Sequence, residues 1–202
     1  MRSLLSVLLA TIILAPLPTD LPAIGQSVCP LQSPIEDEEG EAHIRNICTV
    51  TSINAEKHYW LTAAHCVMPE MLIANHAATV VFIDKDADLL VLQTVNYARP
   101  ALTLRQTAPD VDEPVLMAGH PVGLMDIQVF SGHVSSLLTR VGGETHMMFN
   151  LIACNGNSGS AVVDAEGRVV SVLQIAFGPG CGSFSGGAPY EVVRRLVGAY
   201  FG

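Results

Sequence analysis

The sequence predicts an all-β protein with one short helix near its C-terminus. The 202 residues include 17 glycines and 12 prolines, but only 5% are aromatic. Short apolar runs separated by such turn residues are typical of strands rather than of a helical bundle. Half of the residues (50%) are hydrophobic, which is enough to bury one sizeable core or two small ones.

Apolar residues at alternate positions predict the strands in order along the chain. They cover residues 47–53, 58–62, 79–84, 89–95, 115–119, 127–138, 145–152, 160–164 and 169–177. After the last strand the apolar spacing changes to the helical period, with Val192, Val193, Leu196 and Val197 on one stripe. We therefore expect a closing helix at 190–200.

A proline-containing polar segment within 96–114 interrupts the series of strands and has the composition of a surface linker. We expect this linker at 99–111. The strands then divide into two halves, at about 42–98 and 112–189.

Residues 1–25 have the pattern of a secretory signal peptide. Arg2 precedes an apolar run at 4–15, which is shorter than the roughly 20 residues that span a bilayer. The small residues at 23–25 predict cleavage after Gly25; the alternative is an uncleaved membrane anchor. We therefore expect a secreted or periplasmic protein, with no stable membrane insertion after the signal is removed.

A run of acidic residues occupies 36–41, and its mutual repulsion predicts a solvated acidic leader at 26–41. We expect this leader to precede the first strand of a folded domain at 42–202; a propeptide or a docking tail is the alternative. The formal net charge is −9, and the ten basic residues are scattered. This charge pattern excludes the nucleic-acid-binding class, which needs clustered Lys and Arg.

Five cysteines in an exported chain predict disulfides, because the compartment is oxidising. The sequence alone leaves their pairing open, and one thiol must stay unpaired or bond to another chain. No CxxC pair and no Cys/His group with zinc spacing is present, so we expect no metal and no cofactor. The cysteines are Cys29, Cys48, Cys66, Cys154 and Cys181.

The stretch G-N-S-G-S at 156–160 places Ser158 within an apolar region. A serine hydroxyl is a weak nucleophile and needs a neutral imidazole, which a buried carboxylate orients. His65 follows a predicted strand in a turn of small residues, and Asp88 stands at the start of an apolar strand. Because a buried carboxylate needs a partner, these three residues are candidates for a Ser–His–Asp triad.

Glycines on both sides of Ser158 allow positive φ angles without a Cβ clash. The amides of Gly156 and Ser158 could therefore point together at a developing oxyanion. We expect these two amides to form an oxyanion hole.

Three motifs, in the order His, Asp, Ser, resemble those of the trypsin/chymotrypsin-like serine peptidases. They are L-T-A-A-H-C at 61–66, D-L-L-V-L at 88–92 and G-N-S-G-S-A-V at 156–162. The stretches at 118–124, 129–137 and 164–170 are similar to those of bacterial HtrA-type (Deg) peptidases, although no PDZ-like segment follows. The resemblance implies two antiparallel six-stranded β-barrels with the active site in the cleft between them.

The resemblance also implies roles for individual residues. His65 corresponds to the general base, Asp88 to its orienting carboxylate and Ser158 to the nucleophile. It further implies the disulfides Cys48–Cys66 and Cys154–Cys181, which leaves Cys29 as the odd thiol and as a possible intermolecular link.

Some positions depart from the family pattern. His65 and Asp88 are only 23 positions apart, so Asp84 and Asp86 remain alternatives for the third triad member. Asn157 stands where zymogen-type enzymes carry an aspartate, and activation by a new amino terminus is therefore not expected. The aligned primary specificity pocket carries no acid and should be apolar; its residues are Ile152, Ala153, Ala176, Phe177, Gly178 and Ala188.

Two functional hypotheses follow. The first is a secreted serine endopeptidase that acts on protein or peptide substrates through an acyl-enzyme. The second is a catalytically silent or latent peptidase-fold protein that serves as a binding module. A hydrolase of the α/β type is disfavoured, because its nucleophile elbow needs glycine where Ser160 stands.

Overall fold

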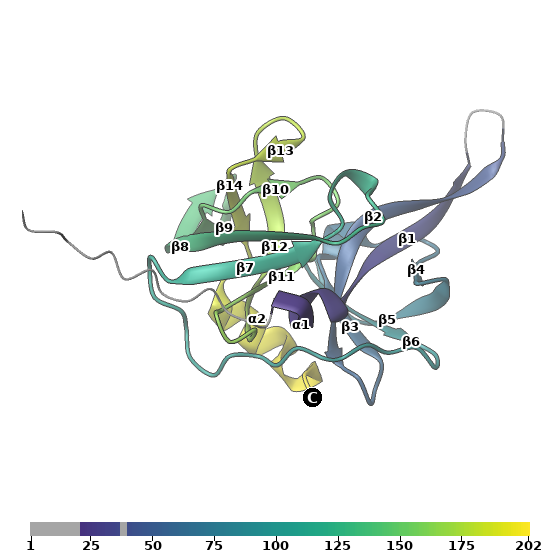
Figure 1. The fold of residues 1–202 in the computed structure, drawn as a ribbon, viewed down its shortest axis with the longest axis horizontal. Helices are drawn as coiled ribbons and strands as arrows, with labels where there is room; N and C mark the ends of the chain where they lie inside the picture. Colours follow the sequence, from purple (N-terminus) through teal and green to yellow (C-terminus); the bar gives the residue numbers. More distant parts are fainter. Residues whose placement is uncertain (1–20, 37–39) are drawn as a thin grey trace, which may run out of the picture.

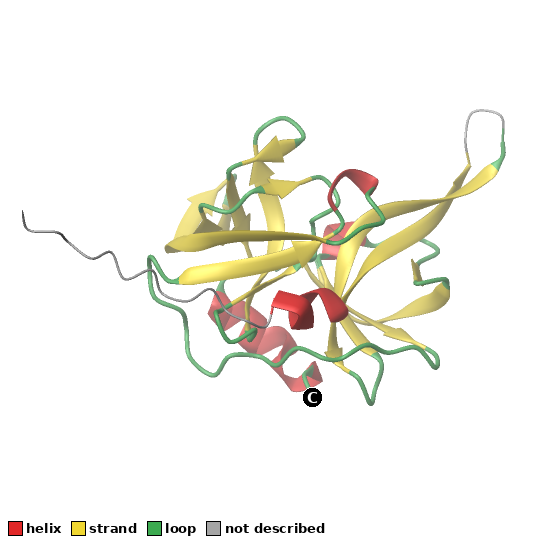
Figure 2. Cartoon of the chain, viewed as in Figure 1, coloured by secondary structure: helices red, strands yellow, loops and turns green. Residues whose placement is uncertain are grey.

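The computed structural model describes residues 21–36 and 40–202, whose strands form two closed six-stranded barrels (Figure 1). Neighbouring strands pair antiparallel in both barrels, and a short helix closes the chain (Figure 2). The predicted fold class is therefore confirmed. Residues 1–20, which contain most of the predicted signal peptide, and residues 37–39 of the acidic run lie outside the described residues.

Barrel 1 has the strand order β1-β2-β3-β6-β5-β4. Its strands are β1 (Val28–Glu36), β2 (Ala42–Asn54), β3 (Tyr59–Thr62), β4 (Leu72–Ile73), β5 (His76–Asp84) and β6 (Leu89–Thr94). The buried Trp60 anchors the interior and donates from Nε1 to Thr94 Oγ1 at 3.0 Å, so that burial leaves no polar atom unpaired. Barrel 1 thus has its own core.

Barrel 2 has the order β11-β12-β14-β9-β8-β7. Its strands are β7 (Pro114–Gly119), β8 (Gln128–Val141), β9 (Glu144–Phe149), β11 (Ala161–Val163), β12 (Val169–Phe177) and β14 (Phe184–Gly187). The short strands β10 (Ala153–Cys154) and β13 (Cys181–Gly182) pair with each other outside the barrel. Met117, Phe149 and Val162 lie in the interior.

Strand β6 is apolar at successive positions because it packs against two different hydrophobic clusters. Leu90 and Leu92 face the interior of barrel 1, whereas Leu89 and Val91 pack in a second cluster with Val193 of the closing helix. Both faces of β6 are therefore buried. That helix is α2 (Tyr190–Val197), which continues as the 3₁₀ turn η3 (Gly198–Tyr200) and confirms the predicted helix.

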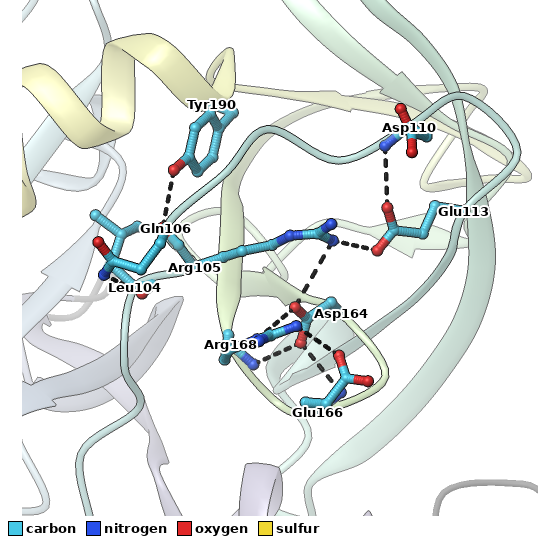
Figure 3. Close-up of polar contacts among 9 residues, drawn as sticks. All are labelled: Leu104, Arg105, Gln106, Asp110, Glu113, Asp164, Glu166, Arg168 and Tyr190. Atoms are coloured by element: carbon cyan, nitrogen blue, oxygen red, sulfur yellow. Dashed lines mark hydrogen bonds and ion pairs between the residues drawn. The ribbon is translucent and has the colours of Figure 1, made fainter.

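Between β6 and β7 the chain forms no strand, only an isolated bridge between Leu104 and Val169 of β12. Arg105 fixes this segment to barrel 2: its guanidinium contacts Glu113 and lies 3.7 Å from the fully buried Asp164 (Figure 3). Arg168 also binds Asp164, at 2.8 Å, and Tyr190 donates to the Arg105 carbonyl at 2.8 Å. The linker is thereby tied to both barrel 2 and α2.

The prediction that a solvated leader at 26–41 precedes the first strand is wrong. Strand β1 lies in that range and pairs with both β2 and β4, which closes barrel 1. Pro30 and Pro34 break the alternation of apolar residues, and the acidic run that follows obscures the end of the strand. Glu36, the first residue of the acidic run, is the last residue of β1, and β2 begins at Ala42, directly after the run.

The segment ahead of β1 is also part of the fold. Residues Leu21–Gln26 form helix α1, and the buried Ile24 packs with Ala118 and Ala161 of barrel 2. Cleavage after Gly25 stays a prediction, and its position would lie within α1. Among the described residues no helix is long and apolar enough to cross a membrane.

Candidate active site

His65 lies just beyond the end of β3, in the 3₁₀ turn η1 (Ala64–Cys66). The small residues Ala63 and Ala64 are buried, whereas 46% of the His65 side chain is exposed. Thr62, the last residue of β3, donates from its hydroxyl to the Thr49 carbonyl of β2 at 2.8 Å. A buried backbone therefore presents an open imidazole.

Asp88 lies in the tight turn between β5 and β6, and its φ angle of 50° is left-handed. Its Oδ1 accepts from the His65 amide and its Oδ2 lies next to His65 Nδ1, both at 2.7 Å. A carboxylate only accepts hydrogen bonds, so Nδ1 carries the proton and Nε2 is left free to act as a base. The two contacts fix both the carboxylate and the ring.

The alternative acids occupy other places in the same turn. Asp84 Oδ1 accepts from the Ala87 amide at 2.9 Å and so shapes the turn. Asp86 is exposed. The structure thus brings Asp88, not Asp84 or Asp86, to His65.

Ser158 lies in the turn between β10 and β11. The fully buried Asn157 shapes this turn, because its Oδ1 accepts from the Cys154 amide at 3.0 Å. The Ser158 carbonyl accepts from the Thr49 amide of barrel 1 at 3.0 Å, and Cys66 Sγ lies 4.0 Å from it. The serine turn therefore lies against the segment that carries His65.

The Ser158 hydroxyl makes no hydrogen bond within the part of the chain that the structure describes. This is compatible with catalysis, because catalytic hydrogen bonds often tighten only when substrate binds.

Gly159 has a φ of +84°, and a Cβ atom there would lie 1.9 Å from Thr62 Oγ1. The close contact explains why glycine must follow the serine.

The Gly156 backbone has a φ of +94°, and a Cβ atom there would lie 2.5 Å from the His120 carbonyl. Thr49 Oγ1 donates to the Gly156 carbonyl at 2.9 Å, and this bond fixes the peptide group between Gly156 and Asn157. Among the described residues the amides of Gly156 and Ser158 have no acceptor, so both are available to an oxyanion.

Thr49 contacts the candidate site at two points and was not identified from the sequence. Its amide binds the Ser158 carbonyl, and its hydroxyl binds the Gly156 carbonyl. The available signal was weak: Thr49 is a buried polar residue directly after Cys48 in an apolar strand.

Both disulfides implied by the resemblance are present. Cys48–Cys66 links β2 to the residue after His65, and Cys154–Cys181 links β10 to β13, four residues before Ser158. Cys48, His65 and Cys66 are the only close group of metal-ligating residue types in the described ranges, and the bonded sulfurs are not available to an ion.

Cys29 is the free cysteine, as the resemblance implied, but only 1% of it is exposed. Burial raises the pKa of its thiol, and the hydrogen bond with Tyr97 and the charge of Arg99 oppose that effect in part. An intermolecular disulfide through Cys29 would require β1 to open, so the structure argues against this prediction.

The residues of the predicted specificity pocket differ in exposure. Ile152, Ala176 and Gly178 are exposed, and Phe177 contacts Phe184 with its ring tilted and 5.6 Å between ring centroids. Ala153 is buried in the core of barrel 2, whereas Ala188 packs in the cluster beneath α2. The apolar pocket therefore stays a prediction.

Comparison with protein families gives one match, to the trypsin-like peptidase domain over residues 48–172. Similar solved structures include the Rv3671c protease in its inactive form, which is 18% identical with a TM-score of 0.71. That match covers 92% of this chain and 93% of the other. None of the curated proteins matches the chain in sequence.

Two structures of the HtrA-type protease AlgW are also similar. A serine-to-alanine variant with a tripeptide is 20% identical with a TM-score of 0.75, covering 90% of this chain and 62% of AlgW. The complex with a decapeptide is 19% identical with a TM-score of 0.75, covering 88% and 65%. The chain thus spans less than two thirds of AlgW, and at these identities the likeness concerns the fold.

Proposed function

Because this chain belongs to the family of trypsin-like peptidase domains, we propose that it is an exported serine endopeptidase with the triad Ser158, His65 and Asp88. The observation that carries the proposal is the two-point contact between Asp88 and His65, at 2.7 Å to both the amide and Nδ1. It leaves Nε2 as the only basic ring nitrogen.

The reaction begins when Ser158 Oγ attacks the carbonyl carbon of the scissile peptide bond, while His65 Nε2 takes the hydroxyl proton. The carbonyl oxygen becomes an oxyanion that the amides of Gly156 and Ser158 stabilise. In other serine peptidases, of unrelated fold, removing one such donor costs about 2.7 to 4 kcal/mol. Asp88 stabilises the imidazolium and holds its orientation.

The tetrahedral intermediate collapses when the carbon–nitrogen bond breaks and His65 gives its proton to the leaving amine. The acyl-enzyme on Ser158 is then hydrolysed: His65 takes a proton from water, the hydroxide attacks the acyl carbon, and the proton returns to Ser158. No metal or cofactor enters these steps.

For the substrate we propose extended peptides with an apolar side chain before the scissile bond, because the aligned pocket positions carry no acid. The solved AlgW structures contain a tripeptide and a decapeptide, which supports a peptide substrate for this fold. Two disulfides support export, since such bonds persist in oxidising compartments.

The test is labelling of the exported full chain with a fluorophosphonate, followed by peptide-library profiling. Labelling is expected for the parent and should disappear in Ser158→Ala and His65→Ala. Ser160→Ala is the matched control, because Ser160 is a buried serine two residues away whose hydroxyl has no partner among the described residues. A folded parent that resists labelling and cleaves no peptide would favour the binding-module hypothesis.

A further inference from the structure

The left-handed backbone of Asp88 has a support in barrel 2. Gln174 of β12 donates from Nε2 to the carbonyl of Ala87 at 2.7 Å and to that of Asp88 at 3.1 Å. Asp88 has a φ of 50°, a conformation that is uncommon outside glycine and requires support from surrounding structure. Gln174 therefore connects the two barrels at the residue that orients His65.

His146 of β9 fixes the orientation of Gln174 in turn. Carbonyl oxygens only accept, so the amide nitrogen of Gln174 must face Ala87 and Asp88, and its Oε1 must face His146 Nδ1, 3.1 Å away. Oε1 also only accepts, so Nδ1 of His146 carries a proton. Both residues are buried, at 3% exposed for His146 and 8% for Gln174.

The series of contacts ends at the protein surface. Glu144 Oε2 lies 3.7 Å from His146 Nε2, and 67% of the Glu144 side chain is exposed. A cleft of about 510 Å³ adjoins the series, lined by His146, Gln174 and Asp88 among others. Water in this cleft can hydrate the Ala87 and Asp88 carbonyls when Gln174 is replaced, so we expect Gln174 variants to fold.

We propose that Gln174 and His146 are positioning residues for the triad: they hold the Asp88 backbone so that its carboxylate meets both the amide and Nδ1 of His65. The proposal rests on the proposed function of Ser158, His65 and Asp88. It assigns to barrel 2, which carries the serine, a second task of ordering the acid of barrel 1.

The sharpest variant is Gln174→Glu, which keeps the shape of the side chain but removes both donors. We expect kcat for a peptide substrate to fall by about 10- to 100-fold with KM little changed, as misplacement of a catalytic group by about 1 Å does. The matched control is Gln93→Glu, because Gln93 also donates to a backbone carbonyl, that of Lys57 at 2.9 Å, from the opposite end of β6. The control should keep the parent kcat.

Two variants at His146 test the second contact. His146→Leu removes the donor to Gln174 and should lower kcat, whereas His146→Asn retains an N–H near the Nδ1 position and should restore most of it. Equal losses in His146→Leu and His146→Asn would indicate packing alone and would overturn the role of His146. An unchanged kcat in folded Gln174→Glu would overturn the role of Gln174.

Proton NMR separates this proposal from the proposed function. The Nδ1 proton of His65, identified by its loss in His65→Ala, should give a low-field resonance in the parent that weakens in Gln174→Glu and His146→Leu. The signal reports the contact with Asp88 even if the parent cleaves no peptide. A resonance unchanged in both variants would overturn the proposal whether or not the protein is an active peptidase.

Discussion

The two barrels hold their parts of the candidate active site in different ways. In barrel 1 the side chain of Asp88 fixes the side chain of His65. In barrel 2 the distinctive part is the backbone around Ser158: among the described residues the amides of Gly156 and Ser158 have no acceptor, and Gly156 and Gly159 adopt positive φ angles. Changing the Asp88 side chain should therefore affect the chemistry of His65, and restricting the backbone at Gly159 should affect the stability of the serine turn.

The largest effect is expected when the side-chain contact in barrel 1 is changed. Asp88→Asn should lower kcat by about 10⁴-fold while the fold persists, because asparagine tolerates the left-handed backbone but favours the wrong imidazole tautomer. The measurement is steady-state hydrolysis of a peptide substrate, with thermal unfolding as the check on folding. Full activity in Asp88→Asn, combined with loss in Asp84→Asn or Asp86→Asn, would assign the third triad member elsewhere.

A smaller effect, on stability rather than chemistry, is expected from backbone change in barrel 2. Gly159→Ala places a methyl group against Thr62 Oγ1 and the Thr49 carbonyl at a φ of +84°. The overlap and the strained backbone should lower the free energy of unfolding by about 2 to 5 kcal/mol.

Gly167→Ala is the matched control for that experiment. Gly167 has a φ of +78° but no atom within 4 Å of the added methyl, so only the backbone penalty of about 1 to 2 kcal/mol should appear. Urea unfolding of both variants measures the difference. Equal losses would mean that contact with barrel 1 contributes nothing to the requirement for glycine at 159.

The smallest effect is expected where side chains hold barrel 2 to the linker, away from the site. Burial alone would raise the pKa of Glu113, but the hydrogen bonds from Arg105 and the Asp110 amide, with the nearby positive charges, hold it below its usual value. A lowered pKa means that the stabilisation is present above the ordinary glutamate range, near pH 4, and is lost as the pH falls through the folded value.

Glu113→Gln should therefore be less stable than the parent at pH 7, and the difference should shrink as the pH falls below the ordinary glutamate range. Thermal unfolding across this range measures it. A difference between the two proteins that stays constant with pH would exclude the ionised carboxylate as its source.

Sequence patterns predicted those parts of the fold whose local signal is strong. Strand β12 has the predicted boundaries, and helix α2 begins where predicted and ends at Val197, where the 3₁₀ turn η3 continues to Tyr200. Strand β1 was missed because two prolines interrupt it, and its place in the barrel depends on pairing with β2 and β4. The pairing of a strand with a distant strand cannot be predicted from the residue pattern of either strand alone.

The same reasoning separates the site residues that were predicted from those that were not. His65 and Ser158 stand in distinctive local motifs. Gln174 is a single glutamine in an apolar strand, which signals a buried partner, but that partner is a carbonyl 86 positions away in the other barrel. A backbone carbonyl has no residue type, so no sequence pattern could identify it.

The buried thiol of Cys29 affects how the chain acquires its covalent form. Thiol–disulfide exchange requires a thiolate and access, and burial disfavours both for Cys29. Once β1 has closed barrel 1, the Cys29 thiol is no longer accessible to attack the Cys48–Cys66 bond or a disulfide of another molecule. Burial of β1 in the closed barrel thus protects the two native disulfides from exchange with the fifth cysteine.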